Sequence, residues 1–411
     1  MRIKRILLVF IITILTFTTT VSAQTPEITA TSGIVIDCID GKILYEKNMN
    51  EKLYPASMTK VLTAIIVVEN CNMQDEVTIS KSAINNVQSG YLTANIKEGE
   101  ILTVEQLLNL LLISSYNDVA NALAEHVGGS VENFAIMMNE KAEELGCKNS
   151  NFVNSNGAHD VNHYSTAYDM ALIAKYAMQF DEIKNIVNKI YYELGTTNKY
   201  DKTDRLYQTT NEMLLSGSSN YYKYVEGIKT GFTTPAGYCL MIYAEKNDMP
   251  LVSVVMKSTT SDSRYEDTKK ILEYAYSNNT IKTINEKGTT LQTITIKNAT
   301  SETKKLNAVL EGTIKAVVKK ETDINSFEPN IEIQDNLKAP IKEGTVIGEV
   351  IYKIEGKEYH KNLVAENNVN KSYTLLIFIL IFIGLILILG TLRVLALYNR
   401  NKVLKNIRGK K

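Results

Sequence analysis

The sequence has few of the residues that build metal and redox sites. Its 411 residues include only four His and four Cys. The Cys residues are widely spaced, which disfavours metal and redox chemistry; buried free thiols are favoured, and a disulfide is left open. No H-E-x-x-H occurs, and His159 and His163 lie in a polar, loop-like stretch. We therefore predict no metal site.

Two further absences narrow the function. The sequence has no G-x-S-x-G, the turn that presents the nucleophile in many Ser-His-Asp hydrolases, so that triad is disfavoured. It also has no excess of charge of either sign, with 45 Lys and Arg against 45 Asp and Glu. A zero balance argues against nucleic acid as a partner, because a nucleic-acid binder needs a basic surface.

The zero net charge conceals a segregation of charge along the chain. Residues 1–23 carry +3, residues 393–411 carry +7, and residues 24–392 therefore carry −10. At the N-terminus, the basic start is followed by an apolar run over residues 6–17 and then by small residues ending at Ala23. This order predicts a secretory signal peptide over residues 1–23.

A second apolar run lies near the C-terminus. Residues 373–392 contain no charged residue over 20 positions, which is long enough for a helix to cross a bilayer. The basic residues 393–411 follow at once and predict a cytoplasmic tail. With the polar residues 367–372 as a linker, the acidic body is expected to lie outside the membrane.

The body is expected to form two domains. Residues 24–280 have strand patterns at both ends and helical patterns between them, which predicts an α+β domain whose sheet combines both ends. The expected elements are a hairpin over 33–47, helices over 58–68, 104–127, 131–145, 166–180 and 264–277, and strands around 228–230, 237–244 and 251–256. Residues 283–366 are predicted to form a small β-sandwich domain, because short alternating runs are separated by Gly or Pro turns. Its expected strands are 292–297, 305–310, 315–319, 346–354 and 358–364.

The strongest candidate for chemistry is a Ser-Lys pair at the start of the first helix. Ser57 and Lys60 are three residues apart, which places them on one helical face within hydrogen-bond reach. A Lys that is buried near another cation has a lowered pKa and can accept the serine proton near neutral pH. A second Ser-x-x-Lys, Ser301–Lys304, falls in the β region without an apolar helix and is read as a surface coincidence.

Two more short motifs follow in a fixed order. Ser115-Tyr-Asn117 lies within the helical segment 104–127, and Lys229-Thr230-Gly231 ends a strand. Taken singly, each has an ordinary reading: a Ser that caps a helix, polar groups on a helix surface, and a solvated charge at a strand end. Their order and their structural contexts make the set specific.

This ordered set is the signature of penicillin-binding proteins and class A β-lactamases. The longer runs around the motifs extend the match: residues 54–60, 163–166, 225–231 and 236–238. Over residues 24–366 the chain resembles the low-molecular-mass penicillin-binding proteins that are serine-type D-alanyl-D-alanine carboxypeptidases. The resemblance implies a penicillin-binding/serine β-lactamase-like transpeptidase fold, with an antiparallel sheet and a helical cluster. It also implies a bacterial cell-membrane location, a role in peptidoglycan biosynthesis and cell shape, the peptidoglycan stem peptide as substrate, β-lactams as acylating inhibitors, and no cofactor.

The resemblance also assigns roles to individual residues. Ser57 is the expected nucleophile and Lys60 the general base; Ser115 is a proton relay, assisted by Asn117 and Lys229. Substrate binding is assigned to Thr230, Gly231, Arg264 and the backbone N–H of Phe232, which forms the oxyanion hole with that of Ser57. Arg264 is assigned by the resemblance alone, and a guanidinium suits the terminal carboxylate of the substrate. Two residues depart from the usual pattern: Tyr116, expected to narrow the cleft or alter the β-lactam response, and Phe232.

Three alternative functions stay open. A class A β-lactamase has E-x-x-L-N after the second motif, but here Glu105–Asn109 precedes Ser115, so this reading is disfavoured. A D,D-endopeptidase that cuts peptidoglycan cross-links would use the same residues. A catalytically inactive, peptidoglycan-binding membrane protein would use the fold without the chemistry, which the intact Ser57, Lys60 and Lys229 argue against.

Overall fold

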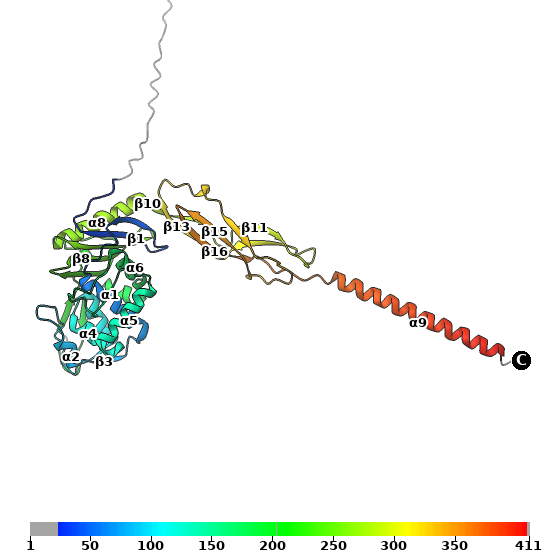
Figure 1. The fold of residues 1–411 in the computed structure, drawn as a ribbon, viewed down its shortest axis with the longest axis horizontal. Helices are drawn as coiled ribbons and strands as arrows, with labels where there is room; N and C mark the ends of the chain where they lie inside the picture. The colour runs from blue at the N-terminus through cyan, green and yellow to red at the C-terminus, as the bar shows by residue number, and fades with distance from the viewer. Residues whose placement is uncertain (1–23, 203, 409–411) are drawn as a thin grey trace, which may run out of the picture. The chain divides into compact units, whose positions relative to one another are not determined.

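The computed structural model describes residues 24–202 and 204–408. They fall into two compact units that divide between Ile281 and Lys282 (Figure 1). The predicted signal peptide, residues 1–23, lies outside the described residues. All four cysteines are free thiols: Cys38, Cys71, Cys147 and Cys239.

The first unit is built on one antiparallel sheet of five strands in the order β2-β1-β9-β8-β7. The strands are β1 (Ser32–Asp37), β2 (Ile43–Lys47), β7 (Val225–Thr233), β8 (Gly237–Lys246) and β9 (Met249–Ser258). The N-terminal β1 pairs with the late β9, with Ile34 opposite Val254. The prediction that the sheet combines both ends of the domain is therefore confirmed.

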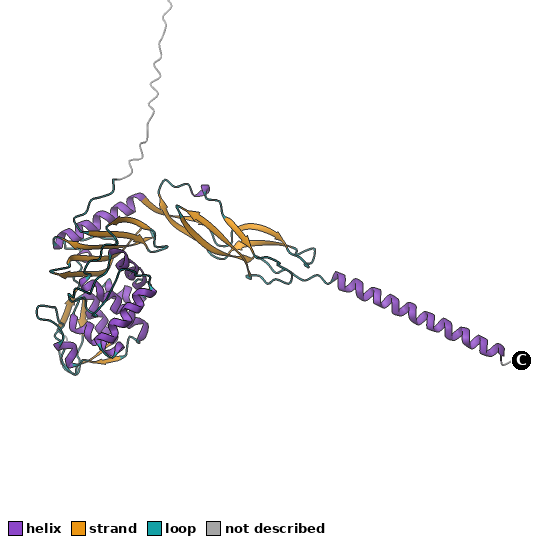
Figure 2. Cartoon of the chain, in the orientation of Figure 1, coloured by secondary structure: helices purple, strands orange, loops and turns teal. Residues whose placement is uncertain are grey.

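Helices cover both faces of this sheet, and most of them gather on one side (Figure 2). The helix α8 lies along one face, and α6 lies against the other with α1, α4 and α5 beyond it (Figure 1). The helices are α1 (Thr59–Asn70), α2 (Lys81–Asn85), α3 (Val104–Ile113), α4 (Asn117–Gly128), α5 (Val131–Glu144), α6 (Ala167–Ala177), α7 (Asp181–Val187) and α8 (Ser261–Asn278). Nearly all of α1 is buried, because the helices surround it, and this explains its continuous apolar sequence.

The prediction of one helix over residues 104–127 is wrong. The segment forms two helices, α3 and α4, with a break at Ser114, Ser115 and Tyr116. At the break Ser115 has a φ of 70°, and the hydroxyl of Ser114 donates to the carbonyl of Gln208 at 3.0 Å. Serine side chains compete with the helix for backbone partners, so the pair ends α3 although the apolar periodicity continues.

Several short elements were not predicted. In the first unit they are α2, α7, the hairpin of β3 (Glu76–Thr78) and β4 (Ile101–Thr103), the hairpin of β5 (Tyr191–Leu194) and β6 (Arg205–Gln208), and two short 3₁₀ helices, η1 (Ala56–Met58) and η2 (Glu212–Leu214). Strands of three or four residues give too short a pattern to recognise in a sequence.

The second unit is all-β apart from a short 3₁₀ turn, η3 (Ile324–Ser326), and the C-terminal helix. Its five-stranded sheet has the order β11-β12-β16-β15-β14, and β10 pairs with β13 in a smaller sheet. The strands are β10 (Asn279–Asn285), β11 (Thr290–Thr295), β12 (Lys305–Leu310), β13 (Ile314–Lys319), β14 (Asn330–Ile333), β15 (Val346–Ile354) and β16 (Lys357–Ala365). The inward residues of these strands form a separate core that includes Leu306, Ile347 and Leu363. All five strands that the alternating pattern predicts are present.

The C-terminal helix α9 (Thr374–Arg408) is a single unbroken helix. Within the described part of the chain, it is the one helix long and apolar enough to cross a membrane. It begins close to the predicted start of the span but continues past residue 392 through the basic segment, so the described part of that segment is helical.

Candidate active site

Ser57 lies in η1, a 3₁₀ helix of one turn that directly precedes α1. The turn is tight, because Ala56 adopts a φ of 48°. The loop residue Gly157 makes room for it: a Cβ at Gly157 would lie 1.9 Å from the carbonyl oxygen of Ala56. The position of Ser57 therefore depends on the backbone conformation of its own turn and on close packing against Gly157, 100 residues later in the chain.

Lys60 is fully buried in the first turn of α1, and its Nζ has three oxygen neighbours. These are Ser57 Oγ at 3.1 Å, Asn117 Oδ1 at 2.9 Å and the carbonyl oxygen of Asn156 at 2.6 Å. Burial, together with the charge of Lys229, lowers the pKa of Lys60 well below its usual value, although Asp118 opposes the shift. A neutral amine donates to the two fixed acceptors, and its lone pair then faces the hydroxyl of Ser57.

Ser115 and Asn117 reach the site because the chain breaks between α3 and α4. No described residue bonds the buried Oγ of Ser115, which lies in the cleft wall. Asn117 is the first residue of α4; besides its bond to Lys60, its Nδ2 donates to the carbonyl of Leu92 at 2.9 Å. Asn117 therefore joins Lys60 to the loop that carries Leu92 in the cleft wall.

The strand β7 carries Lys229, Thr230, Gly231 and Phe232 past the serine turn. Lys229 is buried, and burial together with the charge of Arg264 lowers the pKa of Lys229 to about 7. A Cβ at Gly231 would lie 3.0 Å from the carbonyl oxygen of Pro55, so glycine lets the strand approach the turn closely. The ring of Phe232 is half exposed and packs on Tyr238, with ring centroids 4.5 Å apart.

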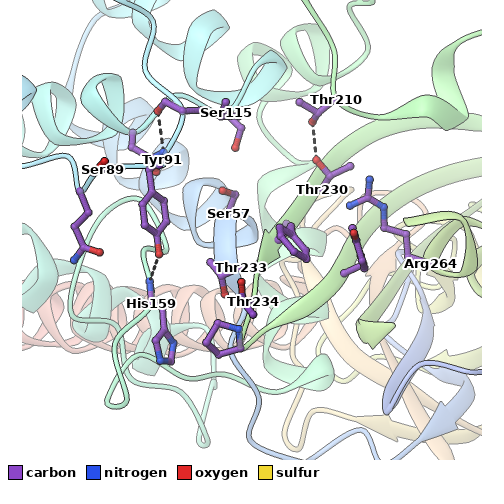
Figure 3. Close-up of a pocket in the computed structure, with 18 residues that line it drawn as sticks. Ser57, Ser89, Tyr91, Ser115, His159, Thr210, Thr230, Thr233, Thr234 and Arg264 are labelled. Atoms are coloured by element: carbon purple, nitrogen blue, oxygen red, sulfur yellow. Dashed lines mark hydrogen bonds between the residues drawn. The ribbon is translucent and has the colours of Figure 1, made fainter. Parts of the chain in front are cut away.

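These segments enclose a cleft of about 620 Å³. All the predicted site residues line it except Lys60 and Lys229, which are buried. Ser57 lies near the middle of the cleft, with Ser115 and Thr230 close to it on adjacent sides (Figure 3). The arrangement has a hydroxyl nucleophile open to a ligand and an amine with a lowered pKa beside it, which is what acyl transfer by a serine needs.

Arg264 occupies one end of this cleft and is not a surface charge. Its side chain is 8% exposed, and its Nη2 donates to the Tyr265 hydroxyl at 2.8 Å and to Ser261 Oγ at 3.3 Å. The guanidinium lies 4.6 Å from the ring centroid of Tyr265. A cation held in a cleft wall in this way suits a ligand with a carboxylate.

Tyr116 does not narrow the cleft, contrary to expectation. Its ring packs edge-on against Tyr207, with centroids 5.5 Å apart, and the residue is not part of the cleft wall. The extended backbone of Tyr116, which precedes α4, turns its side chain away while Ser115 and Asn117 face the site.

Sequence reasoning did not find several residues that shape the site. Asn156 supplies a carbonyl to Lys60, and Thr210 lines the cleft. A backbone carbonyl has no side-chain signature; the only sign in the sequence was the turn-forming Asn154-x-Asn156-Gly157. Among the described side chains, no group of three or more His, Cys, Asp or Glu is placed to hold a metal ion.

His163 is buried and bonds Thr59, two residues after Ser57, the expected nucleophile. Its Nδ1 accepts a hydrogen bond from the backbone N–H of Val153 at 3.2 Å, so its Nε2 carries the proton and donates to Thr59 Oγ1 at 2.8 Å. The side chain is 2% exposed, and burial lowers the pKa of His163 to about 4. Protonation would remove the acceptor that Val153 needs and would place a charge in the core.

We expect His163 to make the first unit acid-sensitive. The folded pKa lies below the unfolded value of about 6.5, so the unfolded chain binds more protons between these values, and stability falls as pH falls through this window. The loss from pH 7 to pH 5 is about 2 kcal/mol. His163→Asn, which keeps an acceptor for Val153, should lose that much less stability between the two pH values, as measured by urea unfolding followed by circular dichroism. The exposed His126→Asn should behave as wild type; an unchanged acid response in His163→Asn would exclude this role.

The comparisons with known proteins agree with this geometry. Residues 19–260 match the family model described as D-alanyl-D-alanine carboxypeptidase (Peptidase S11). This chain belongs to that family. Residues 280–371 match a second model, the C-terminal domain of penicillin-binding protein 5. The carboxypeptidase-like fold expected from the sequence is thereby confirmed.

Individual relatives match over most of the chain. D-alanyl-D-alanine carboxypeptidase DacF of Bacillus subtilis is 33% identical over 343 residues, which cover 82% of this chain and 84% of the relative. The crystal structure of penicillin binding protein 5 from Haemophilus influenzae is similar with a TM-score of 0.68 and 29% identity, covering 85% of this chain and 99% of that one. The Streptomyces K15 DD-transpeptidase is similar over 62% of this chain and 99% of its own, with a TM-score of 0.57 and 30% identity.

Proposed function

We propose that this serine-type D-alanyl-D-alanine carboxypeptidase hydrolyses the terminal D-Ala-D-Ala bond of peptidoglycan stem pentapeptides through an acyl-enzyme on Ser57. The observation that carries the proposal is the 3.1 Å contact between Ser57 Oγ and the buried Lys60 Nζ. Because the pKa of Lys60 is lowered, the amine can take the hydroxyl proton while Oγ attacks the carbonyl carbon of the penultimate D-alanine.

The tetrahedral intermediate would place its oxyanion at the backbone N–H groups of Ser57 and Phe232. The close approach of β7 to the serine turn at Gly231 supports this arrangement. Such donors stabilise charge only as it develops, and they do not need to reorganise.

Collapse of the intermediate requires a proton for the leaving D-alanine amine. Ser115 Oγ lies in the cleft wall, and Lys229 has a pKa of about 7, so near neutral pH it can either hold or release a proton. Ser115 and Lys229 would pass the proton, Asn117 would orient the acyl group, and Thr230 and Arg264 would hold the leaving carboxylate. Water then hydrolyses the acyl-enzyme; a β-lactam would follow the first half and stall in the second.

We further propose that α9 anchors the enzyme in the bacterial cell membrane by a single pass. The first part of α9 is apolar and its last part carries basic residues, and this order supports a cytoplasmic C-terminus. The predicted signal peptide would export the acidic body, so the cleft would work outside the membrane on the cell wall.

Product analysis separates this activity from cross-link cleavage. We expect the detergent-solubilised full chain to release D-alanine from a muropeptide with a pentapeptide stem, and to do so faster than it cuts a cross-linked dimer, both followed by chromatography. Cleavage of the dimer alone would make the protein an endopeptidase. No cleavage of either, without labelling by penicillin, would favour the non-catalytic binding protein.

A further inference from the structure

A chain of hydrogen bonds joins the two side chains that would hold the substrate carboxylate, and it runs through residues that have no role so far. At one end, Thr230 Oγ1 lies 2.6 Å from Thr210 Oγ1. At the other, Arg264 Nη2 donates to the hydroxyl of Tyr265. The link between the ends is the Tyr265 hydroxyl, which donates to the carbonyl oxygen of Thr210 at 3.3 Å.

Tyr265 is placed to act as a fixed support. Its side chain is 1% exposed, and its ring lies under the Arg264 guanidinium. Thr210 is also tied down, because its backbone N–H donates to the carbonyl of Ile113 at the end of α3. Through these contacts one buried hydroxyl fixes both Arg264 and the segment that carries Thr210.

The proton count of the threonine pair gives Thr210 its role. Each hydroxyl has one proton, so only one of the two can donate within the pair. If Thr230 donates to Thr210, it has no proton left for a carboxylate. If Thr210 donates instead, the Thr230 proton is free to point into the cleft, where both hydroxyls lie (Figure 3). An arriving carboxylate selects this second arrangement, and hydrogen bonds in such a chain strengthen one another.

Arg264 does not use all of its donors within the protein. Its Nη2 is occupied by Tyr265 and Ser261, whereas no described residue accepts from its buried Nε.

We propose that Thr210 and Tyr265 are positioning residues for recognition of the substrate's terminal carboxylate. Thr210 donates to Thr230 and so directs the Thr230 proton at the carboxylate. Tyr265 fixes the positions of Arg264 and the Thr210 backbone relative to each other through the two hydrogen bonds of its hydroxyl. This inference rests on the proposed function, because it assumes a substrate that ends in a free carboxylate.

The test compares two peptides with the same stem sequence, one ending in D-Ala-D-Ala and the other in the C-terminal amide. The acid is assayed as a substrate with the solubilised full chain, and the amide is assayed as a competitive inhibitor, so that its binding is measured whether or not it is cleaved. We expect Thr210→Val to raise KM for the acid about fivefold, because the variant loses the one neutral hydrogen bond that orients Thr230, with kcat within about twofold. The inhibition constant of the amide should change less than about twofold.

Conservative variants separate positioning from a general loss of structure. Thr210→Ser keeps the hydroxyl and should restore a KM near that of wild type. Tyr265→Phe keeps the buried ring. It should raise KM for the acid and leave the inhibition constant of the amide unchanged. Thr234→Val, at an exposed threonine of the same cleft, should leave both constants near wild type.

Three results would overturn the inference. They are an unchanged KM for the acid in Thr210→Val, an equal rise in KM for the acid and in the inhibition constant of the amide, or a KM in Thr210→Ser as high as in Thr210→Val. In each of these, release of D-alanine by wild type would leave the proposed function standing. If wild type releases no D-alanine from the acid, the proposed function fails and the inference falls with it.

Discussion

Replacing Ser57 with alanine should abolish covalent labelling of this protein by a fluorescent penicillin. The Ser57 hydroxyl is the atom that would form the ester, because it lies 3.1 Å from Nζ of Lys60, an amine whose pKa is lowered by burial. Labelling is read on a denaturing gel after incubation with the solubilised full chain, where a covalent adduct survives and bound ligand does not.

The fold should tolerate this change. Ser57→Ala removes one oxygen atom and leaves the bonds of Lys60 to Asn117 and Asn156 in place, so we expect the free energy of unfolding to change by about 1 kcal/mol or less. Ser301→Ala provides the matched control, because Ser301 begins the second Ser-x-x-Lys of the chain at an exposed position. Equal labelling of Ser57→Ala and wild type would remove Ser57 as the nucleophile and, with it, the proposed mechanism.

Replacing Lys60 with methionine should slow acylation by about 10²- to 10⁴-fold, the usual contribution of a positioned general base. Methionine has a similar length, so the serine turn keeps its packing, but no group then accepts the Ser57 proton. The change also leaves Asn117 Oδ1 and the Asn156 carbonyl without their donor, so some stability should be lost. The second-order rate constant for penicillin labelling measures the effect on chemistry.

The pH dependence distinguishes a base from a structural lysine. Only neutral Lys60 can accept the proton, so wild-type acylation should rise as pH rises through the lowered pKa of Lys60 and level off above it. In Lys60→Met this rise should be absent, while Lys304→Met, from the exposed second motif, should keep the wild-type rate and profile. A Lys60→Met variant that labels at the wild-type rate would assign Lys60 a structural role.

Local patterns in the sequence predicted much of the fold. The hairpin of β1 and β2 was predicted from the strand-like residues 33–47, and β7 to β9 from further strand-like runs that turn residues separate. Five of the seven strands of the second unit were also predicted; β10 and β14 were not. The conformation of these strands is set largely by residues that are close in sequence, so a local sequence pattern predicts them.

The break between α3 and α4 shows where local patterns fail. The apolar period runs through residues 104–127, but Ser114 finds a better partner at Gln208, which is 94 residues away in sequence. That contact exists only in the folded chain. Its consequence reaches the site, because the break points Ser115 and Asn117 at the cleft and turns Tyr116 toward Tyr207.

The reacting groups can be identified from their spacing along the chain: Ser57 and Lys60 are one helical turn apart, and two further motifs follow in the order that the family uses. What those groups can do depends on how the chain packs. Burial by the surrounding helices lowers the pKa of Lys60, and the Asn156 carbonyl and Asn117 leave its lone pair for Ser57. Thr210 and Tyr265 join the site only through contacts between distant segments. Spacing along a chain fixes which side chains share a turn, but desolvation and long-range hydrogen bonds arise only when the chain packs.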